Sequence, residues 1–362
     1  MTLSLVDPTT APSTRRNADG DVRGSDYAAL SRRVRQAGLF EPTPGFYIGL
    51  STVLLGLFVA GWTAFALLGD SWYQLLVAAG LAIVGAQIAF LGHDIAHRQV
   101  FRSRRAAERA GALGSLLIGL TYGWWQDKHT RHHANPNHLD HDPDVGLGVI
   151  AWTPEQAEAH RGLGRFLVRW QAYLFFPLLL LEGIHLHISS ARAVITDRGT
   201  PHRRLEGFFL AVYALVHVGL PFLVLSPLKA VLFVVVLQGV FGLYLGCSFA
   251  PNHKGMPLLQ PGEKLDYLRR QVLTARNVYG GRWLDVLFGG LNFQIEHHLF
   301  PSVPRARLRQ LRPIVKEYCA ERGVAYHETG LIASYREALT HLHHVGEQLR
   351  VGVKASEGAP AA

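Results

Sequence analysis

The chain has 362 residues, of which 49% are hydrophobic and only 17% are charged. Soluble proteins carry about 25% charged residues, so this composition favours a membrane protein. The formal net charge of +9 suits an anionic lipid surface or an acidic protein partner, and no basic stretch interleaved with aromatic residues indicates nucleic-acid binding. The two cysteines, Cys247 and Cys319, lie far apart in the chain, which argues against a disulfide framework or a thiolate metal site.

Both ends of the chain are polar. Residues 1–45 are rich in arginine and contain no apolar stretch of the kind found in a signal peptide. We expect them to form a mobile tail, with room for a surface helix. Residues 346–362 predict a disordered C-terminal tail. The region between the tails, 46–345, is expected to form one membrane domain.

Four segments have the length and the apolar character of membrane-spanning helices, which need about 20 apolar residues each. They are residues 46–69, 72–92, 207–225 and 228–250. The first two and the last two are joined by very short connections, so each pair predicts a tight hairpin. Of the 36 lysines and arginines, only Lys229 lies within the hairpins. Because basic residues mark the cytoplasmic side, both hairpins are predicted to begin and end in the cytoplasm, across a bacterial cytoplasmic membrane.

Two further apolar stretches, 110–125 and 173–181, are shorter than a typical span. We interpret both as helices that lie in the membrane interface or pack against the hairpins. The predicted fold class is therefore an all-α integral membrane protein. It has four transmembrane helices in two hairpins, interfacial helices and a cytoplasmic cap.

The chain contains 19 histidines, and many of them fall into three clusters close to the predicted spans. Residues three or four apart share one face of a helix, with Cβ atoms about 5–6 Å apart, so each cluster can present its side chains to one metal. The clusters comprise His93 with His97, then His129 with His132 and His133, and last Gln294 with His297 and His298.

This pattern is specific. A random His-x-x-His-His is expected about 0.05 times in a chain of this length and composition. A single histidine at a membrane boundary is most often an ordinary polar residue, but ionisable groups are costly at membrane depth and three clusters indicate a site. The two hairpins place all three clusters on one side of the membrane, so the clusters can converge on one centre.

The three clusters resemble the histidine boxes of the membrane fatty acid desaturases. Residues 124–144 around the second cluster and residues 250–254 are similar to that family too, and the resemblance covers roughly residues 45–330. The Gln-x-x-His-His form of the third box resembles the front-end (Δ5/Δ6-like) desaturases, which act between an existing double bond and the carboxyl end. No His-Pro-Gly-Gly motif indicates a fused cytochrome b5 domain.

The resemblance implies a di-iron centre, with His253 as a further ligand beside the box histidines. The eight implied ligands are His93, His97, His129, His132, His133, His253, His297 and His298. Gln294 either ligates, holds a water or orients a neighbour. Asp94 and Glu296 lie inside boxes and are expected either to accept the free N–H of a ligating imidazole or to face solvent. Asp142 and Asp144 are expected to support the ligands in the same way or to cap a proline-containing loop.

The implied reaction is the O2-dependent insertion of a double bond into a fatty acyl chain. An unactivated methylene has no acidic proton, so its oxidation needs a redox-active metal and O2 as co-substrate, and zinc has no redox chemistry. The implied partners are an acyl substrate taken from the bilayer, membrane lipid, and an external electron donor. That donor is a ferredoxin, or a cytochrome b5-like protein with its reductase.

Two other interpretations share some of these features. A di-iron hydroxylase or ketolase of the same superfamily has the same boxes, but the third box and the long match around the second favour desaturation. A metal-binding transporter or sensor without catalysis would instead spread its histidines through the spans along a pathway.

Overall fold

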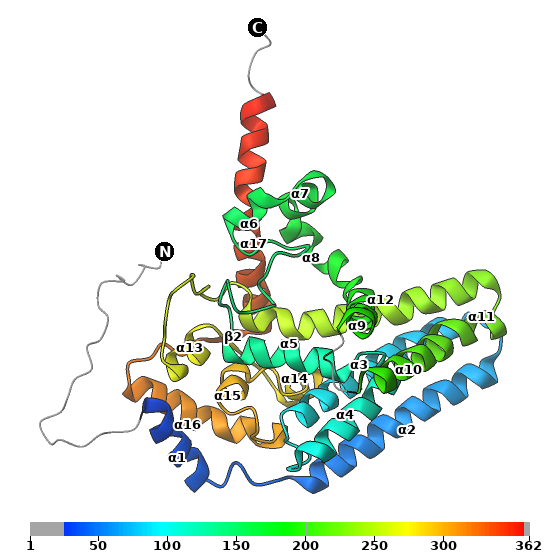
Figure 1. Cartoon of the computed structure of the whole chain (residues 1–362), viewed down its shortest axis with the longest axis horizontal. Coiled ribbons are helices and arrows are strands. Elements are labelled where there is room, and N and C mark those ends of the chain that lie inside the picture. The colour runs from blue at the N-terminus through cyan, green and yellow to red at the C-terminus, as the bar shows by residue number, and fades with distance from the viewer. Residues whose placement is uncertain (1–24, 198, 200–201, 358–362) are drawn as a thin grey trace, which may run out of the picture.

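The computed structural model describes residues 25–197, 199 and 202–357, and these are almost entirely helical. Figure 1 shows long helices that extend to one side of a helical cap. The described residues contain four helical spans that are long and apolar enough to cross a membrane. The spans are α2 (Pro44–Leu68), α3 (Gln74–Ala96), α10 to α11 (Arg203–Val224) and α12 (Pro227–His253). They match the four predicted segments, and the predicted all-α membrane fold is confirmed.

The third span is not a uniform helix. It consists of α10 (Arg203–Ala214), a π-helical turn η1 (Leu215–Gly219) and α11 (Leu220–Val224). Of the four spans, α3 and α12 are the most buried. The last turns of these two inner helices, at the cap, contain His93 and His253, respectively.

The two hairpins are tied together at the ends that lie away from the cap. Asp70 Oδ1 accepts hydrogen bonds from the backbone nitrogen and the hydroxyl of Ser226, at 2.8 and 3.1 Å. Lys229 Nζ lies 3.1 Å from Asp70 Oδ2. The lysine near the start of α12 is therefore paired with the acidic residue of the opposite connection.

The apolar stretch predicted at 110–125 is two helices, not one. These are α4 (Arg104–Ile118) and α5 (Tyr122–Ala134). The chain leaves α4 at Gly119, which adopts a left-handed conformation (φ +67°) that favours glycine. The second predicted stretch corresponds to α8 (Gln171–Leu179), which meets α9 (Glu182–Thr196) at a bend of 70°. By length and composition this pair could also form a broken fifth span or a re-entrant loop.

The cap is built from several parts of the chain that come together at one end of the spans (Figure 1). Its strands β1 (Asn277–Tyr279) and β2 (Glu328–Gly330) form a short parallel pair. The remaining helices are α1 (Asp26–Gln36), α6 (Pro154–Ala159), α7 (Gly162–Arg169), α13 (Tyr267–Leu273), α14 (Arg282–Leu287), α15 (Gln294–Leu299), the 3-10 turn η2 (Arg305–Arg307), α16 (Leu308–Glu321) and α17 (Leu331–Glu357).

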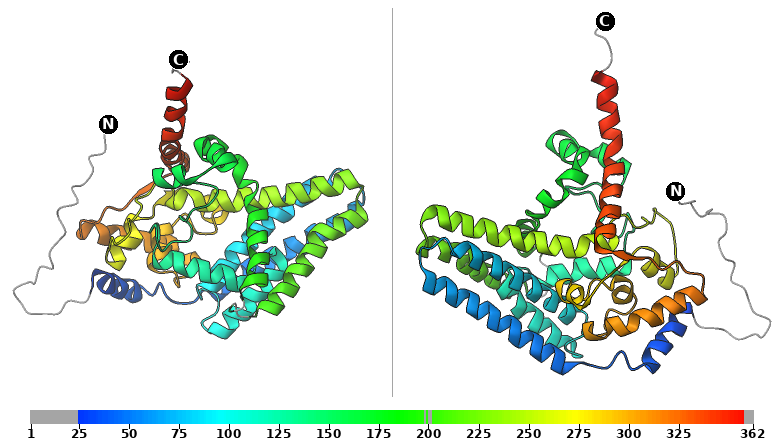
Figure 2. Two further views of the ribbon diagram at one scale, coloured as in Figure 1. Left: turned by 45° about the horizontal axis from the view of Figure 1, so that its top comes forward. Right: turned by 180° about the vertical axis from the view of Figure 1, so that it is seen from behind.

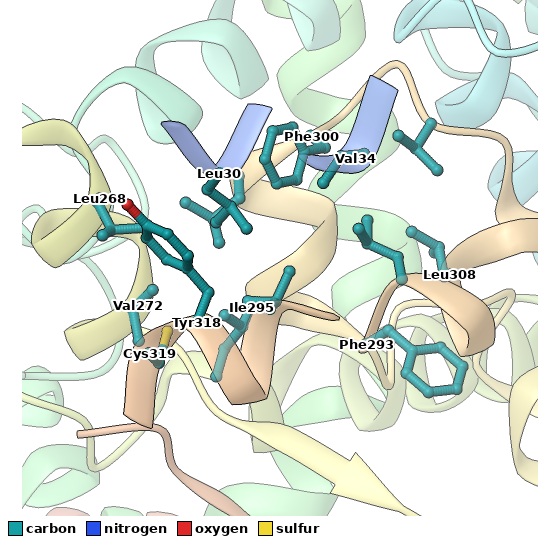
Figure 3. Close-up of a cluster of buried hydrophobic side chains, with 14 of the residues drawn as sticks. Leu30, Val34, Leu268, Val272, Phe293, Ile295, Phe300, Leu308, Tyr318 and Cys319 are labelled. Atoms are coloured by element: carbon teal, nitrogen blue, oxygen red, sulfur yellow. The ribbon is translucent and has the colours of Figure 1, made fainter. Parts of the chain in front are cut away.

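Helix α1 belongs to the folded cap. Figure 3 shows Leu30 and Val34 of α1 in a cluster with Phe300 and Tyr318, and all four side chains are buried. The surface helix for which residues 1–45 were expected to have room is α1, and its apolar face is buried against the cap, so this part of the segment is not a mobile tail. Residues 1–24 lie outside the described residues.

The prediction that a disordered tail begins at residue 346 is wrong. Helix α17 continues to Glu357 and extends away from the cap (Figure 2). Its residues Val345 and Leu349 are buried together with Val168 of α7, which explains why the helix does not end at residue 345. Residues 358–362 lie outside the described residues.

Candidate metal centre

Helix α5, which carries the second box, is held by its neighbours. The amides at the start of a helix have no partners within it. Here the amide groups of residues 121–123 donate to Ser190 Oγ, Ser115 Oγ and Glu206 Oε1, at 3.0–3.2 Å. Three side chains from α4, α9 and α10 therefore fix the position of α5 relative to the bundle.

The ends of α12 and α15 are held by side chains of the cap. The buried guanidinium of Arg276 donates to the carbonyls of Pro251 and Lys254 at the end of α12, and it pairs with Glu337. The amide of Ile295, in the first turn of α15, donates to Asn277 Oδ1 at 2.9 Å. These contacts set the relative positions of the helices that carry His253 and the third box.

The eight predicted histidines come together in two groups. Within each group, one ring nitrogen of every member lies within 4.8 Å of those of the others. The larger group is His93, His97, His129, His133 and His297, and the smaller group is His132, His253 and His298. The groups are adjacent, since the rings of His133 and His298 stack with their centroids 4.2 Å apart.

Hydrogen bonds determine which nitrogen is free in the smaller group. His253 Nδ1 lies 2.9 Å from the carbonyl oxygen of Thr274, and His298 Nδ1 lies 3.0 Å from Gln271 Oε1. Both partners are acceptors, because the amide nitrogen of Gln271 donates to the carbonyl of His133. Each Nδ1 must therefore carry a proton, which leaves a lone pair on each Nε2.

These two lone pairs face each other. His253 Nε2 and His298 Nε2 are 3.1 Å apart, and neither carries a proton that could join them. Two opposed lone pairs repel each other, whereas a cation between them would be bound by both. This donor arrangement fits a metal ion.

His132 completes the smaller group in the same way. Its Nδ1 lies 3.0 and 2.9 Å from the two oxygens of Asp142, so its Nε2 is free to bind a metal. Asp142 also accepts the backbone amides of Asn137 and Asp144. Burial lowers the pKa of His132, but the charges and hydrogen bond of Asp142 and the charge of Asp144 outweigh it, and the net shift is upward.

Asp144 contributes mainly by charge. Its Oδ2 lies 3.5 Å from His132 Nδ1, and its Oδ1 lies 2.5 Å from Lys128 Nζ. Asp142 is therefore the direct partner of His132, and Asp144 pairs with a lysine next to the second box.

The larger group also offers unprotonated nitrogens. His97 and His129 bring their Nε2 atoms within 2.9 Å of each other, and His133 and His297 bring theirs within 3.1 Å. Burial, followed by the neighbouring imidazoles, lowers the pKa of all four, and that of His97 to about 3. Neutral imidazoles are the form that binds metals.

The acidic residues inside the boxes have different surroundings. Asp94 Oδ1 lies 3.6 Å from His93 Nδ1, and its other oxygen lies 2.7 Å from Arg305 Nη2. Glu296 is buried, and its two carboxylate oxygens accept hydrogen bonds from Asn277 and Tyr326 rather than from a box histidine of the described residues. The expectation that Glu296 accepts from a ligating histidine or faces solvent is therefore corrected, because its side chain points from α15 into the cap.

Gln294 lies beside the smaller group and is buried. Its amide nitrogen is 2.9 Å from His253 Nε2, and its oxygen accepts a hydrogen bond from Asn252 at 3.2 Å. Since His253 Nε2 is unprotonated, the amide nitrogen of Gln294 donates to it, and Gln294 lies directly beside the smaller group.

Three residues that touch the site had no role in the sequence analysis. Gln271 has no signature, because it lies in an ordinary amphipathic helix, and Thr274 acts through a backbone carbonyl that any residue would supply. Arg305 follows the third box by only seven positions. A basic residue so close to a box could have been predicted to pair with one of the box carboxylates, as it does with Asp94.

Comparison with known proteins agrees with this geometry. A family model described as fatty acid desaturase matches residues 70–330. The chain is 30% identical over 320 residues to a Delta(8)-fatty-acid desaturase of Helianthus annuus, which covers 83% of the chain and 69% of that relative. It is 30% identical over 319 residues to a Delta(5) fatty acid desaturase of Caenorhabditis elegans, with 83% and 69% covered. A Delta(6)-fatty-acid desaturase of the same organism is 26% identical over 342 residues, with 90% and 75% covered. The chain therefore belongs to the fatty acid desaturase family of membrane oxidoreductases.

Proposed function

We propose that this enzyme is an O2-dependent di-iron desaturase with front-end selectivity. The proposal rests above all on the opposed lone pairs of His253 and His298, which make the smaller group a cation site. The residues proposed to hold the two ions are the eight histidines of the two groups. Relatives whose names specify Δ5, Δ6 and Δ8 positions support front-end selectivity.

Iron would supply the oxidising power that an unactivated CH2–CH2 pair requires, by reducing O2. In the overall reaction the acyl chain loses two hydrogens, two electrons and two protons are taken up, and O2 is reduced to two waters. The all-imidazole donor set suits a redox-active first-row metal.

The protein's own side chains prepare the site. Gln271, Asp142 and the carbonyl of Thr274 hold the Nδ1 protons of three histidines, so that each Nε2 points into the centre. Burial of His132, His253 and His298 keeps water away from that side of the centre. Because His93 and His253 lie in the last turns of two membrane spans, the acyl substrate is proposed to enter the centre from the bilayer.

The proposed orientation places the centre on the cytoplasmic face of a bacterial cytoplasmic membrane. The concentration of Lys and Arg outside the hairpins supports this orientation. The electrons would come from a separate acidic ferredoxin, or from a cytochrome b5-like protein with its reductase, to which the basic cytoplasmic surface is complementary.

Expression in a host that makes no polyunsaturated lipids tests the activity. The fatty acids of cells with the wild-type chain are compared by mass spectrometry with those of cells that carry His297→Ala. Additional double bonds only in the wild-type cells support the proposal, and their position on the chain reports the selectivity. New hydroxyl groups would instead indicate a hydroxylase.

A further inference from the structure

Helix α14 presents a group of apolar side chains to the outside of the cap. Trp283, Val286 and Leu287 are 61%, 68% and 39% exposed. An exposed group of this kind on one short helix marks an interaction surface. We propose that α14 inserts into the membrane interface and that these side chains contact the acyl chains of bilayer lipids.

The contacts between α14 and the spans support a position at the membrane interface. Gln87 Nε2, on α3, donates to the carbonyl of Val286 at 3.0 Å, and Tyr244 Oη, on α12, donates to the carbonyl of Leu287 at 2.8 Å. Gln87 lies six residues before His93, which corresponds to about 9 Å along the helix axis. The end of α14 is therefore attached to α3 and α12 within their membrane-spanning segments.

The two span residues have a clear physical role at this depth. Carbonyls in the last turn of a helix lack partners within it, and unpaired backbone groups are not tolerated in hydrocarbon. Gln87 also donates to Tyr244 Oη at 2.6 Å, so the two side chains form one polar unit between α3 and α12. Polar side chains within a membrane span are costly, and here they donate to the last carbonyls of α14, where the carbonyl of Val286 also accepts from the amide of Gly289.

The side of α14 that faces the cap carries Leu284, which is buried with Val278 and Phe288, and also Asp285. Asp285 pairs with Arg309 at 2.7 Å and accepts a hydrogen bond from Asn292 at 3.0 Å. Because the inward side of α14 is already packed and paired, its exposed apolar side is the one available to lipid. Exposed apolar residues of the spans lie close to the attachment of α14 to α3 and α12. Ile83 is one turn from Gln87 on α3, and the ring centroid of Phe249 lies 6.1 Å from that of Phe90, whose ring also approaches that of Tyr244.

The segment is also connected to the metal centre. Gly289 follows α14 in a left-handed conformation (φ +57°), and a Cβ there would overlap the ring of Phe90, three residues from His93. The third box begins only five residues after Gly289. The proposed lipid contact therefore lies at the side of the cap nearest to the centre, although the inference is independent of which metal is bound.

Spin labels can measure the depth of α14. The full chain with Cys247→Ala and Cys319→Ala is reconstituted in phosphatidylcholine–phosphatidylglycerol vesicles and labelled at Val286→Cys. Leu57→Cys in the middle of α2 and Glu317→Cys on the exposed side of α16 serve as the lipid and water references. We expect the Val286 label to be more accessible to O2 than to a water-soluble nickel complex, as at Leu57. Accessibility like that of the Glu317 label would overturn the proposal.

A second experiment needs no substitution. The wild-type enzyme is reconstituted with a phospholipid that carries a diazirine in its acyl chain, irradiated and digested with trypsin. The tryptic peptide 283–305 should carry lipid adducts within residues 283–287. Adducts on the spans but none on this peptide would contradict insertion of α14.

Discussion

The guanidinium Nη2 of Arg305 lies 2.7 Å from Oδ2 of Asp94, and the side chains are only 7% and 3% exposed. This pair joins the first histidine box to the loop that follows the third. The loop is fixed at the same point by the backbone amide of Arg305, which donates to Gln99 Oε1 at 2.9 Å. Since Asp94 also approaches His93, Arg305 is in a position to orient the first box.

Substitution of Arg305 should therefore affect both stability and metal content. Removal of one member of a buried ion pair costs about 3–5 kcal/mol, because the other charge is left without a partner. We expect Arg305→Gln to lower the thermal unfolding midpoint and the bound iron, and Arg305→Lys to restore part of both. Arg33→Gln, which breaks an exposed pair with Glu321, is the matched control. Equal behaviour of the Arg305→Gln and Arg33→Gln proteins in thermal unfolding and elemental analysis would show that the buried pair has no such role.

The box histidines should be essential for metal binding. His132→Ala or His297→Ala removes one of the converging nitrogens, so product should fall below detection and iron per protein should decrease. Membrane insertion should remain, because the spans are unchanged. His344→Ala, on an exposed part of α17, should behave as wild type. Wild-type product from either box variant, measured per amount of inserted protein, would rule out the di-iron assignment.

Removal of the metal should destabilise the cap. A ligand that binds only the folded state stabilises it by about 4 kcal/mol at 1,000 times its dissociation constant. Chelation should thus lower the midpoint of thermal unfolding, and added Fe2+ should restore both the midpoint and activity. Zn2+ should restore the midpoint without activity, because it fits imidazole ligands but has no redox chemistry. A midpoint that is insensitive to chelation in protein shown to have lost its metal would contradict a stabilising ion between His253 and His298.

Substitutions of Gln294 test whether its amide acts at the metal centre or is only buried beside it. Its amide nitrogen lies 2.9 Å from His253 Nε2, and its oxygen, which here accepts from Asn252, would ligate the metal or hold a water on it if the amide were turned round. Gln294→Ile has no lone pair and should abolish activity, whereas Gln294→His restores a donor and should be less harmful. Product per amount of inserted protein, compared for the three forms, tests this. Full activity of Gln294→Ile would remove the residue from the site.

The proposed orientation predicts which segments lie in the cytoplasm. Reporter tags at the N-terminus, within 140–160 and at the C-terminus should all be cytoplasmic, because the charge distribution and the convergence of the boxes both require it. A tag next to Asp70 or Ser226 should lie on the other side, where the two hairpins are tied together. An external 140–160 tag would contradict the orientation, since this loop contains Asp142, the partner of His132.

The sequence by itself determined the features that depend only on neighbouring residues, namely the membrane spans and the spacing of the histidine boxes. A membrane span depends on about 20 consecutive apolar residues, so hydropathy found all four spans to within a few residues. The helical spacing of His129, His132 and His133 depends only on the helix period, and the hairpin topology then required that the clusters meet. These arguments need no knowledge of distant contacts, and for that reason they were sufficient.

Only the tertiary structure decided which residues support the site. Asp94 and Arg305 are more than 200 positions apart in the chain, and Thr274 contributes a carbonyl that its side chain does not reveal. Glu296 occupies a box position next to His297, yet the turn of α15 directs it to Asn277 and Tyr326. Such partners follow from how helices pack, because the direction of a side chain is fixed by its helix but what it meets is fixed by another part of the fold.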